Sequence, residues 1–150
     1  MQGEWTSEGE YGVPVERPPQ FGTRQFLTDK EYADFILEVE WRALETNYNS
    51  GVFVRAGLDG KPFPTIGWQV NLKESAIAAL MKGSETVMPS KTSKFPVNEW
   101  VKFRIEARGK KLAVDINGQR ASEFNELEPA RGYIGIQSEG RAFDFRNLRV

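Results

Sequence analysis

Apolar and polar residues alternate along much of the chain, as they do in β-strands that bury one face. In the segment 35–42 four apolar side chains alternate with a largely polar row; the apolar row is Phe35, Leu37, Val39 and Trp41. The segment 101–116 holds two more apolar rows, which are Val101, Phe103, Ile105 and Ala107, then Leu112, Val114 and Ile116. A turn at Gly109-Lys110 separates these two rows, so the pattern predicts a hairpin of antiparallel strands.

Turn-forming residues divide the expected strands. Asn117-Gly118 is a strong signal for a tight turn with positive φ, and Glu139-Gly140 is expected to close a C-terminal hairpin. Many short strands between Gly, Pro and Asn turns predict an all-β sandwich. The segment 73–80 fits either a short helix or a strand. Residues 1–25 are less regular and hold a proline-rich edge connection, and the whole chain, 1–150, is expected to form one domain.

Strand alternation also places several polar side chains on a face away from the core. If Val52 and Val54 enter the core, their odd-numbered neighbours face outward. Applied to three strands, this rule gives an outward set of Phe53, Arg55, Gln69, Asn71, Tyr133, Gln137 and Glu139. Planar amide and guanidinium groups suit the adjacent hydroxyls of a sugar, and an aromatic ring can stack on it. A solvated sheet face carries the same residue types, so alternation alone leaves both interpretations open.

Composition narrows the chemistry. The chain of 150 residues has 20 Lys+Arg against 21 Asp+Glu, so no overall field favours nucleic acid or an acidic membrane surface. It contains neither Cys nor His, which excludes disulfides, Cys/His zinc sites and nucleophiles activated by histidine. Catalysis would need a carboxylate, Lys, Tyr or a carboxylate-bound metal. No apolar stretch could span a bilayer, and polar residues follow Met1, so neither membrane insertion nor a signal peptide is expected.

Five segments resemble, in order, the 3-keto-disaccharide hydrolase domain family. They are YADFILEVEWR, NSGVFVR, GWQVNL, KFPVNEWVKFRIEARGKKLAVDINGQ and GYIGIQSEGRAFDFRNLRV. The resemblance, which runs from about Phe26 to Val150, implies a concanavalin A-like jelly-roll sandwich of two antiparallel sheets. It also implies a carbohydrate ligand and an extracytoplasmic location, periplasmic or secreted, as is usual for these bacterial proteins. Whether the domain belongs to a larger multidomain protein stays open.

The chain departs from the family pattern in three places. Trp68-Gln69-Val70-Asn71 stands where the family usually has a Tyr-Glu-Val-Gln type motif, so an amide replaces a carboxylate. Gln137-Ser138-Glu139-Gly140 replaces a Gln-Ser-His-Gly type ending, so Glu stands in place of His. Trp100-Val101 replaces a Trp-Asn pair. The first two changes bear on the activity that the family implies, and none bears on the fold.

The resemblance implies that the outward face holds a glycoside oxidised at C3. Its binding residues would be Phe53, Arg55, Gln69, Asn71 and Gln137, with Lys94 contributing from a loop. A C3 ketone acidifies the neighbouring C–H, so cleavage could proceed by proton removal and elimination, followed by addition of water. Glu139 is then the candidate base, and Arg55 would polarise the ketone. An exposed glutamate at a turn is, however, the commoner situation.

Two other kinds of site receive less support. Glu38 and Glu40 would lie about 7 Å apart on one face of a strand, within the range of paired glycosidase carboxylates. The next residue on that face is Arg42, where a glucanase would need a further acid, so a solvated strand with a local salt bridge is favoured. Asp59 lies in an expected turn, but no cluster of Asp and Asn suggests a calcium loop. The sequence therefore indicates no metal site and no cofactor, although a divalent metal stays open.

Three hypotheses follow. The first is a carbohydrate-active enzyme that cleaves a 3-keto glycoside. The second is a non-catalytic carbohydrate-binding module that uses the same face, which the amide at Gln69 and the missing histidine favour. The third is a laminin-G-like domain that contacts protein, for which the sequence offers no specific sign.

Overall fold

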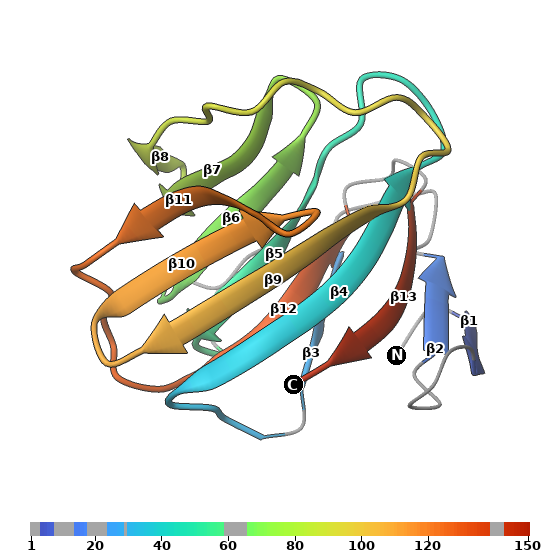
Figure 1. Ribbon diagram of the computed structural model, residues 1–150. Helices are drawn as coiled ribbons and strands as arrows, with labels where there is room; N and C mark the ends of the chain where they lie inside the picture. Colours follow the sequence, from blue (N-terminus) through green and yellow to red (C-terminus); the bar gives the residue numbers. More distant parts are fainter. Residues whose placement is uncertain (1–3, 8–13, 18–23, 29, 59–65, 139–142) are drawn as a thin grey trace.

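The computed structural model describes residues 4–7, 14–17, 24–28, 30–58, 66–138 and 143–150. Within these ranges the chain forms thirteen strands and no helix. The strands make two antiparallel sheets that pack face to face (Figure 1). The predicted all-β sandwich is therefore confirmed. The segment for which helix and strand were both open is a strand, Ala76–Lys82.

The first sheet has seven strands. Their order across the sheet is β1 (Glu4–Ser7), β2 (Pro14–Arg17), β13 (Phe143–Arg149), β4 (Phe35–Ala43), β9 (Val101–Arg108), β10 (Lys111–Ile116) and β11 (Gln119–Phe124). Strands β9 and β10 form the hairpin predicted around Gly109-Lys110. The turn between β10 and β11 has positive φ at Asn117 and Gly118, 50° and 83°, as their sequence predicts.

The second sheet has six strands and carries the candidate site. Its order is β3 (Arg24–Leu27), β12 (Tyr133–Ser138), β5 (Ser50–Ala56), β6 (Trp68–Lys73), β7 (Ala76–Lys82) and β8 (Glu85–Met88). Strands β5 to β8 follow one another along the chain as an antiparallel meander. Strand β12 enters beside β5 from a distant part of the sequence, so residues near 137 lie next to residues near 51.

Two local predictions were wrong. The C-terminal strands β12 and β13 do not form a hairpin, because β12 pairs with β3 and β5 while β13 pairs with β2 and β4 of the other sheet. Alternation shows that each strand buries one face, but it does not show which sheet the strand joins. The N-terminal segment, expected to be irregular, contributes strands β1, β2 and β3. The turn at Glu139-Gly140 lies outside the described residues.

The core fills the space between the sheets with the apolar rows that alternation predicts. The first sheet contributes Leu37, Val39 and Trp41 with Phe103 and Ile105, and the second contributes Val52, Val54, Val70, Leu72, Ile134 and Ile136. Trp41 lies at one end of this core, with the ring centroids of Tyr48, Phe95, Phe103 and Phe143 within 6.0 Å of its own. None of the described segments forms a helix that is long and apolar enough to cross a membrane. The inward rows thus fix which side chains remain on the outer faces.

Candidate functional site

A pocket of about 370 Å³ lies on the outer face of the six-stranded sheet and follows β6. Its floor consists of residues that alternate with the core rows of β5, β6, β7 and β12. The lining residues are Asn49, Phe53, Gly67, Trp68, Gln69, Asn71, Lys73, Met81, Gly83, Ser84 and Gln137. From Gly67 to Lys73 the strand extends about 20 Å, since a strand rises about 3.3 Å per residue. The lining residues therefore extend along the whole of β6.

Two amides meet in the middle of this floor. The Nε2 of Gln69 on β6 donates a hydrogen bond to the Oε1 of Gln137 on β12, which is 3% exposed. Strand β5 separates these two strands, so the side chain of Gln69 reaches across β5 to form the contact. We call this pair, Gln69 and Gln137, the amide bridge. Each amide keeps further donor or acceptor capacity, because the bridge uses one N–H of Gln69 and one lone pair of Gln137.

Apolar side chains flank the amide bridge. Phe53 and Met81 lie directly opposite Gln69 on the neighbouring strands β5 and β7. Phe53 is 6% exposed and lines the pocket, although it lies on the outer face of the sheet. A polar floor beside aromatic and thioether surface is the usual composition of a small-molecule pocket.

Asn71 is buried, and both ends of its side-chain amide contact the protein. Its Oδ1 accepts a hydrogen bond from the backbone N of Lys73 at 3.0 Å, and its Nδ2 donates to the Sδ of Met81 at 3.0 Å. It lines the pocket, as predicted from alternation. These contacts give Asn71 a second role, which is to hold Met81 and the end of β6 in place.

Arg55 does not lie on the pocket face, so its predicted placement is wrong. It is fully buried, and its guanidinium donates to the backbone oxygens of Gly109 at 2.6 Å, Pro129 at 3.1 Å and Ala33 at 2.9 Å. The cause is a β-bulge, because two residues of β5, Val54 and Arg55, lie opposite the single residue Ile134 of β12. Arg55 has φ of 49°, a left-handed conformation that interrupts strand alternation and redirects its side chain.

The other two predicted residues are not part of the described pocket. Lys94 is exposed on the connection between β8 and β9 and does not line the pocket, so its role in binding stays a prediction. Glu139, the candidate base, lies outside the described residues. Of the predicted set, the structure brings together Phe53, Gln69, Asn71 and Gln137.

A comparison with protein-family models confirms the family that the five segments resemble. The sequence model of the 3-keto-alpha-glucoside-1,2-lyase-like domain matches residues 2–150. The chain belongs to this family. No curated protein sequence matches the chain at a significant level.

Solved structures share the fold of this lyase-like domain at low sequence identity. The carbohydrate-binding module CBM66 from Bacillus subtilis is 16% identical, with a TM-score of 0.75, and the match covers 98% of this chain and 90% of that one. A Parabacteroides distasonis ATCC 8503 protein described provisionally as a glycosyl hydrolase is 19% identical, with a TM-score of 0.70 and coverage of 89% and 84%. The galectin LEC-6 from Caenorhabditis elegans is 12% identical, with a TM-score of 0.53 and coverage of 85% and 96%. At these identities the matches establish the jelly-roll sandwich fold.

Lys73 is a lining residue of this lyase-like domain that sequence reasoning missed. It follows Gln69 and Asn71 with the same parity, so extending the alternation by one step along β6 would have found it. Met81 was missed for a different reason, because its strand could not be distinguished from a helix. Among the described lining residues Lys73 alone is ionisable, and none carries a carboxylate. In the same described ranges no three His, Cys, Asp or Glu side chains are grouped to hold a metal ion.

Glu38 and Glu40 lie on the outer face of the other sheet. Glu38 contacts Lys102 Nζ at 2.7 Å and Arg149 at 2.8 Å, and Glu40 contacts Arg146 at 3.0 Å. A hydrogen bond from Lys102 lowers the pKa of Glu38, with burial opposing it and Arg149 assisting. Burial raises the pKa of Glu40, but hydrogen bonds from Asn147 and Arg146 outweigh it and leave that pKa below its ordinary value. Salt bridges therefore occupy both carboxylates, as the interpretation of a solvated strand expected.

Proposed function

We propose that the protein binds a glycoside in the pocket on the outer face of the six-stranded sheet. The amide bridge of Gln69 and Gln137, beside Phe53 in this pocket, is the observation that carries this proposal. Amides donate and accept hydrogen bonds, as sugar hydroxyls do, and an aromatic edge or face offers apolar contact to the ring. Membership of the 3-keto-alpha-glucoside-1,2-lyase-like domain family supports an α-glucoside as the ligand class.

The described part of the pocket favours binding over cleavage. A proton-removing step needs a base, and the described lining residues offer no carboxylate. Lys73 is their one ionisable group, and it is exposed at the end of β6. Binding without turnover is therefore the function that these residues support best. An extracytoplasmic location, which suits a glycoside-binding domain of this family, is part of the same proposal.

Cleavage of a 3-keto glycoside is the second candidate, because the family match extends over residues 2–150. In that reaction a base removes the proton on C2, the bond from C1 to the leaving oxygen breaks, and a C1–C2 double bond forms. The leaving oxygen takes up a proton, and water then adds to the double bond. Glu139 remains the proposed base.

The experiment titrates the protein with methyl α-D-glucopyranoside, trehalose and their 3-keto derivatives by calorimetry, while mass spectrometry follows products. Binding that Gln69→Ala and Gln137→Ala each weaken about tenfold, a loss of about 1.4 kcal/mol, would support the proposal. Gln119→Ala is the matched control, since Gln119 is an exposed glutamine on β11 of the other sheet. Equal losses in all three variants, or no binding by the unmodified protein, would contradict it.

The same experiment separates the two candidates. Turnover of the 3-keto compounds that disappears in Glu139→Gln would establish cleavage. Binding with no product, in the presence and absence of divalent metal, would leave a binding module. Turnover that survives in Glu139→Gln would reject Glu139 as the base.

A further inference from the structure

Gly51 lies beneath the amide bridge. On β5 it is the register partner of Gln137 of β12 on one side and of Asn71 of β6 on the other. Gln69 is paired with Phe53, two residues further along β5. The side chain of Gln69 must therefore run diagonally over Gly51 to reach Gln137.

The missing Cβ of Gly51 is what leaves room for this path. A Cβ on residue 51 would lie 2.1 Å from the Nε2 of Gln69 and 2.7 Å from its Cδ and Cγ. Atoms do not approach so closely without a shift, so any other residue at 51 would displace the side chain of Gln69. Gly51 is not one of the described glycines with positive φ, and its backbone would therefore accept alanine. The constraint on this position is thus the space that Gln69 occupies.

The amide bridge fixes two groups that would otherwise move. A glutamine side chain on a sheet surface samples several rotamers, and immobilising it on binding costs conformational entropy. Here the hydrogen bond to Gln137 holds Gln69 before any ligand arrives. The hydroxyl of Ser50 also donates to the backbone oxygen of Gln137 at 2.5 Å, which ties β12 to β5 beside the bridge. The pocket floor is therefore preorganised.

We propose that Gly51 is the positioning residue of the pocket, and that the amide bridge it permits selects a sugar ring with two adjacent oxygen substituents. The free oxygen of Gln69 and the free N–H groups of the pair offer an acceptor and donors side by side. One oxygen of the ring accepts a hydrogen bond and its neighbour donates one, as a hydroxyl beside a hydroxyl or beside a ketone can do. A ring that lacks either oxygen leaves one amide group without a partner. Sites that hydrogen-bond a substrate group in this way discriminate strongly against an analogue without that group. This inference rests on the proposed function.

The test compares methyl α-D-glucopyranoside with its 2-deoxy and 3-deoxy analogues, and uses Gly51→Ala, Gln69→Ala and the double variant. The unmodified protein is expected to bind the parent sugar at least tenfold more tightly than either analogue. Gly51→Ala should reduce the affinity for the parent sugar about tenfold and remove most of this preference. The double variant should bind no more weakly than either single variant, because both changes remove the same bridge.

A second readout covers the case in which Gly51→Ala weakens the fold. Side-chain amide signals of Gln69 and Gln137, assigned by NMR, should shift together in Gly51→Ala without ligand. The double variant should be at least as stable to urea as Gly51→Ala, because removing the Gln69 side chain removes the clash.

The outcomes are distinct. Unchanged binding and discrimination in Gly51→Ala, or losses that add in the double variant, would overturn this inference and leave the proposed function intact. Equal affinity of the unmodified protein for the parent and deoxy sugars would overturn the selectivity. No binding of any of these sugars by the unmodified protein would contradict both the proposed function and the inference.

Discussion

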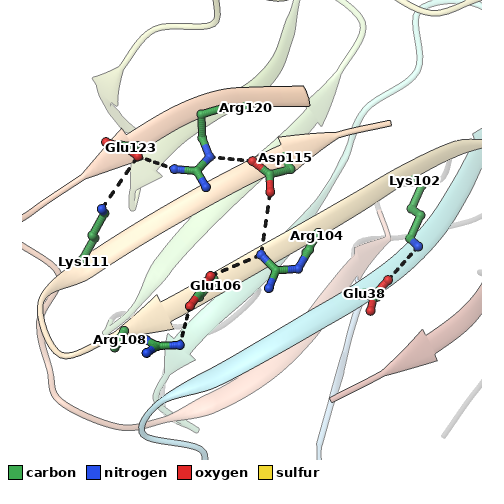
Figure 2. Close-up of polar contacts among 9 residues, drawn as sticks. All are labelled: Glu38, Lys102, Arg104, Glu106, Arg108, Lys111, Asp115, Arg120 and Glu123. Carbon is green, nitrogen blue, oxygen red and sulfur yellow. Dashed lines mark hydrogen bonds and ion pairs between the residues drawn. The ribbon is translucent and has the colours of Figure 1, made fainter. Parts of the chain in front are cut away.

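The two outer faces of the sandwich carry polar side chains of different kinds. Both leave one side of a half-buried sheet to polar side chains. The face of the seven-stranded sheet carries long charged residues that neutralise one another, and Figure 2 shows how their contacts continue from β11 through β10 to β9. The face of the six-stranded sheet carries amides and a glycine, and a pocket is left between them.

We call the outer face of the seven-stranded sheet the charged face. Its arginine side chains contact carboxylates or an aromatic ring. Asp115 lies between Arg104 and Arg120, and Glu106 lies between Arg104 and Arg108 (Figure 2). Near β13 the guanidinium carbons of Arg42 and Arg146 lie 4.6 Å and 3.8 Å from the ring centroid of Trp100. Long side chains that pair in this way cover their own sheet, so the polar character of a face does not by itself indicate a binding site. Short or missing side chains, as at Gly51, are the better indicator.

The largest expected effect concerns Arg55, which belongs to neither face. Arg55→Ala would leave the carbonyls of Gly109, Pro129 and Ala33 without their buried donor. We expect a loss of unfolding free energy on the order of 3 kcal/mol, at about 1 kcal/mol for each of these hydrogen bonds. Urea denaturation measures it, with Arg108→Ala as the control, since Arg108 is 72% exposed and makes one ion pair. If Arg55→Ala had normal stability but no longer bound the glycoside, Arg55 would have to be assigned to the pocket.

The second effect tests the charged face at its most buried group. Asp144 is 2% exposed and accepts two hydrogen bonds from Arg42, at 2.9 Å and 2.8 Å. Asp144→Asn should cost about 1–3 kcal/mol of stability, because a charge-assisted pair is weakened in a buried position. Glycoside affinity should stay within a factor of two, since Asp144 lies on the other sheet. A variant with normal stability but weaker binding would show that the two faces are coupled.

The third effect is the pH dependence of stability, which the carboxylates of the seven-stranded sheet should dominate over the pocket face. The pKa values of Glu38 and Glu40 are lowered in the folded protein, so their ion pairs contribute stability above the ordinary value of 4.5 and lose it as the pH falls below that value. The contribution of these surface pairs should reach about 1 kcal/mol at most. Urea denaturation from about pH 7 to about pH 3, which spans the ordinary glutamate pKa, measures this contribution. Over that range the double variant Glu38→Gln, Glu40→Gln should lose less stability than the unmodified protein.

Glycoside affinity should not follow this pH dependence while the protein stays folded, because the described lining residues include no carboxylate. Calorimetry at neutral pH and near 4.5 measures it. An affinity that falls in acid, and that Glu139→Gln makes independent of pH, would place a working carboxylate beside the ligand. That result would favour cleavage over binding.

Alternation predicted the parts of the molecule where strands are regular. The core rows of β4, β9 and β10 and the outward positions of Phe53, Gln69 and Gln137 follow from a period of two. The placement of the Arg55 side chain was predicted wrongly, because alternation assumes an extended backbone and Arg55 has a φ of 49°. No local pattern in the sequence predicts that bulge. Gly132 lies against the backbone of Arg55, since a Cβ there would lie 2.4 Å from the backbone carbon of Arg55.

The amide bridge could not be predicted for a different reason. Gln69 and Gln137 are 68 residues apart, and their meeting depends on the neighbour order β12-β5-β6. The sequence pattern predicted instead that β12 forms a hairpin with the next strand, and that prediction does not place β12 beside β5. Residue types on a face can therefore be predicted from parity, whereas contacts between them require the topology of the sheet.

The smallest expected effect compares two exposed lysines. Lys73 lines the pocket and Lys94 does not, although the sequence suggested only Lys94. Lys73→Ala should weaken glycoside binding two- to fivefold, because one solvated interaction contributes up to about 1 kcal/mol. Lys94→Ala should change it less than twofold, with both measured by calorimetry in the same buffer. A larger effect at Lys94 would mean that the connection between β8 and β9 reaches the bound sugar, which would extend the site beyond the face of the six-stranded sheet.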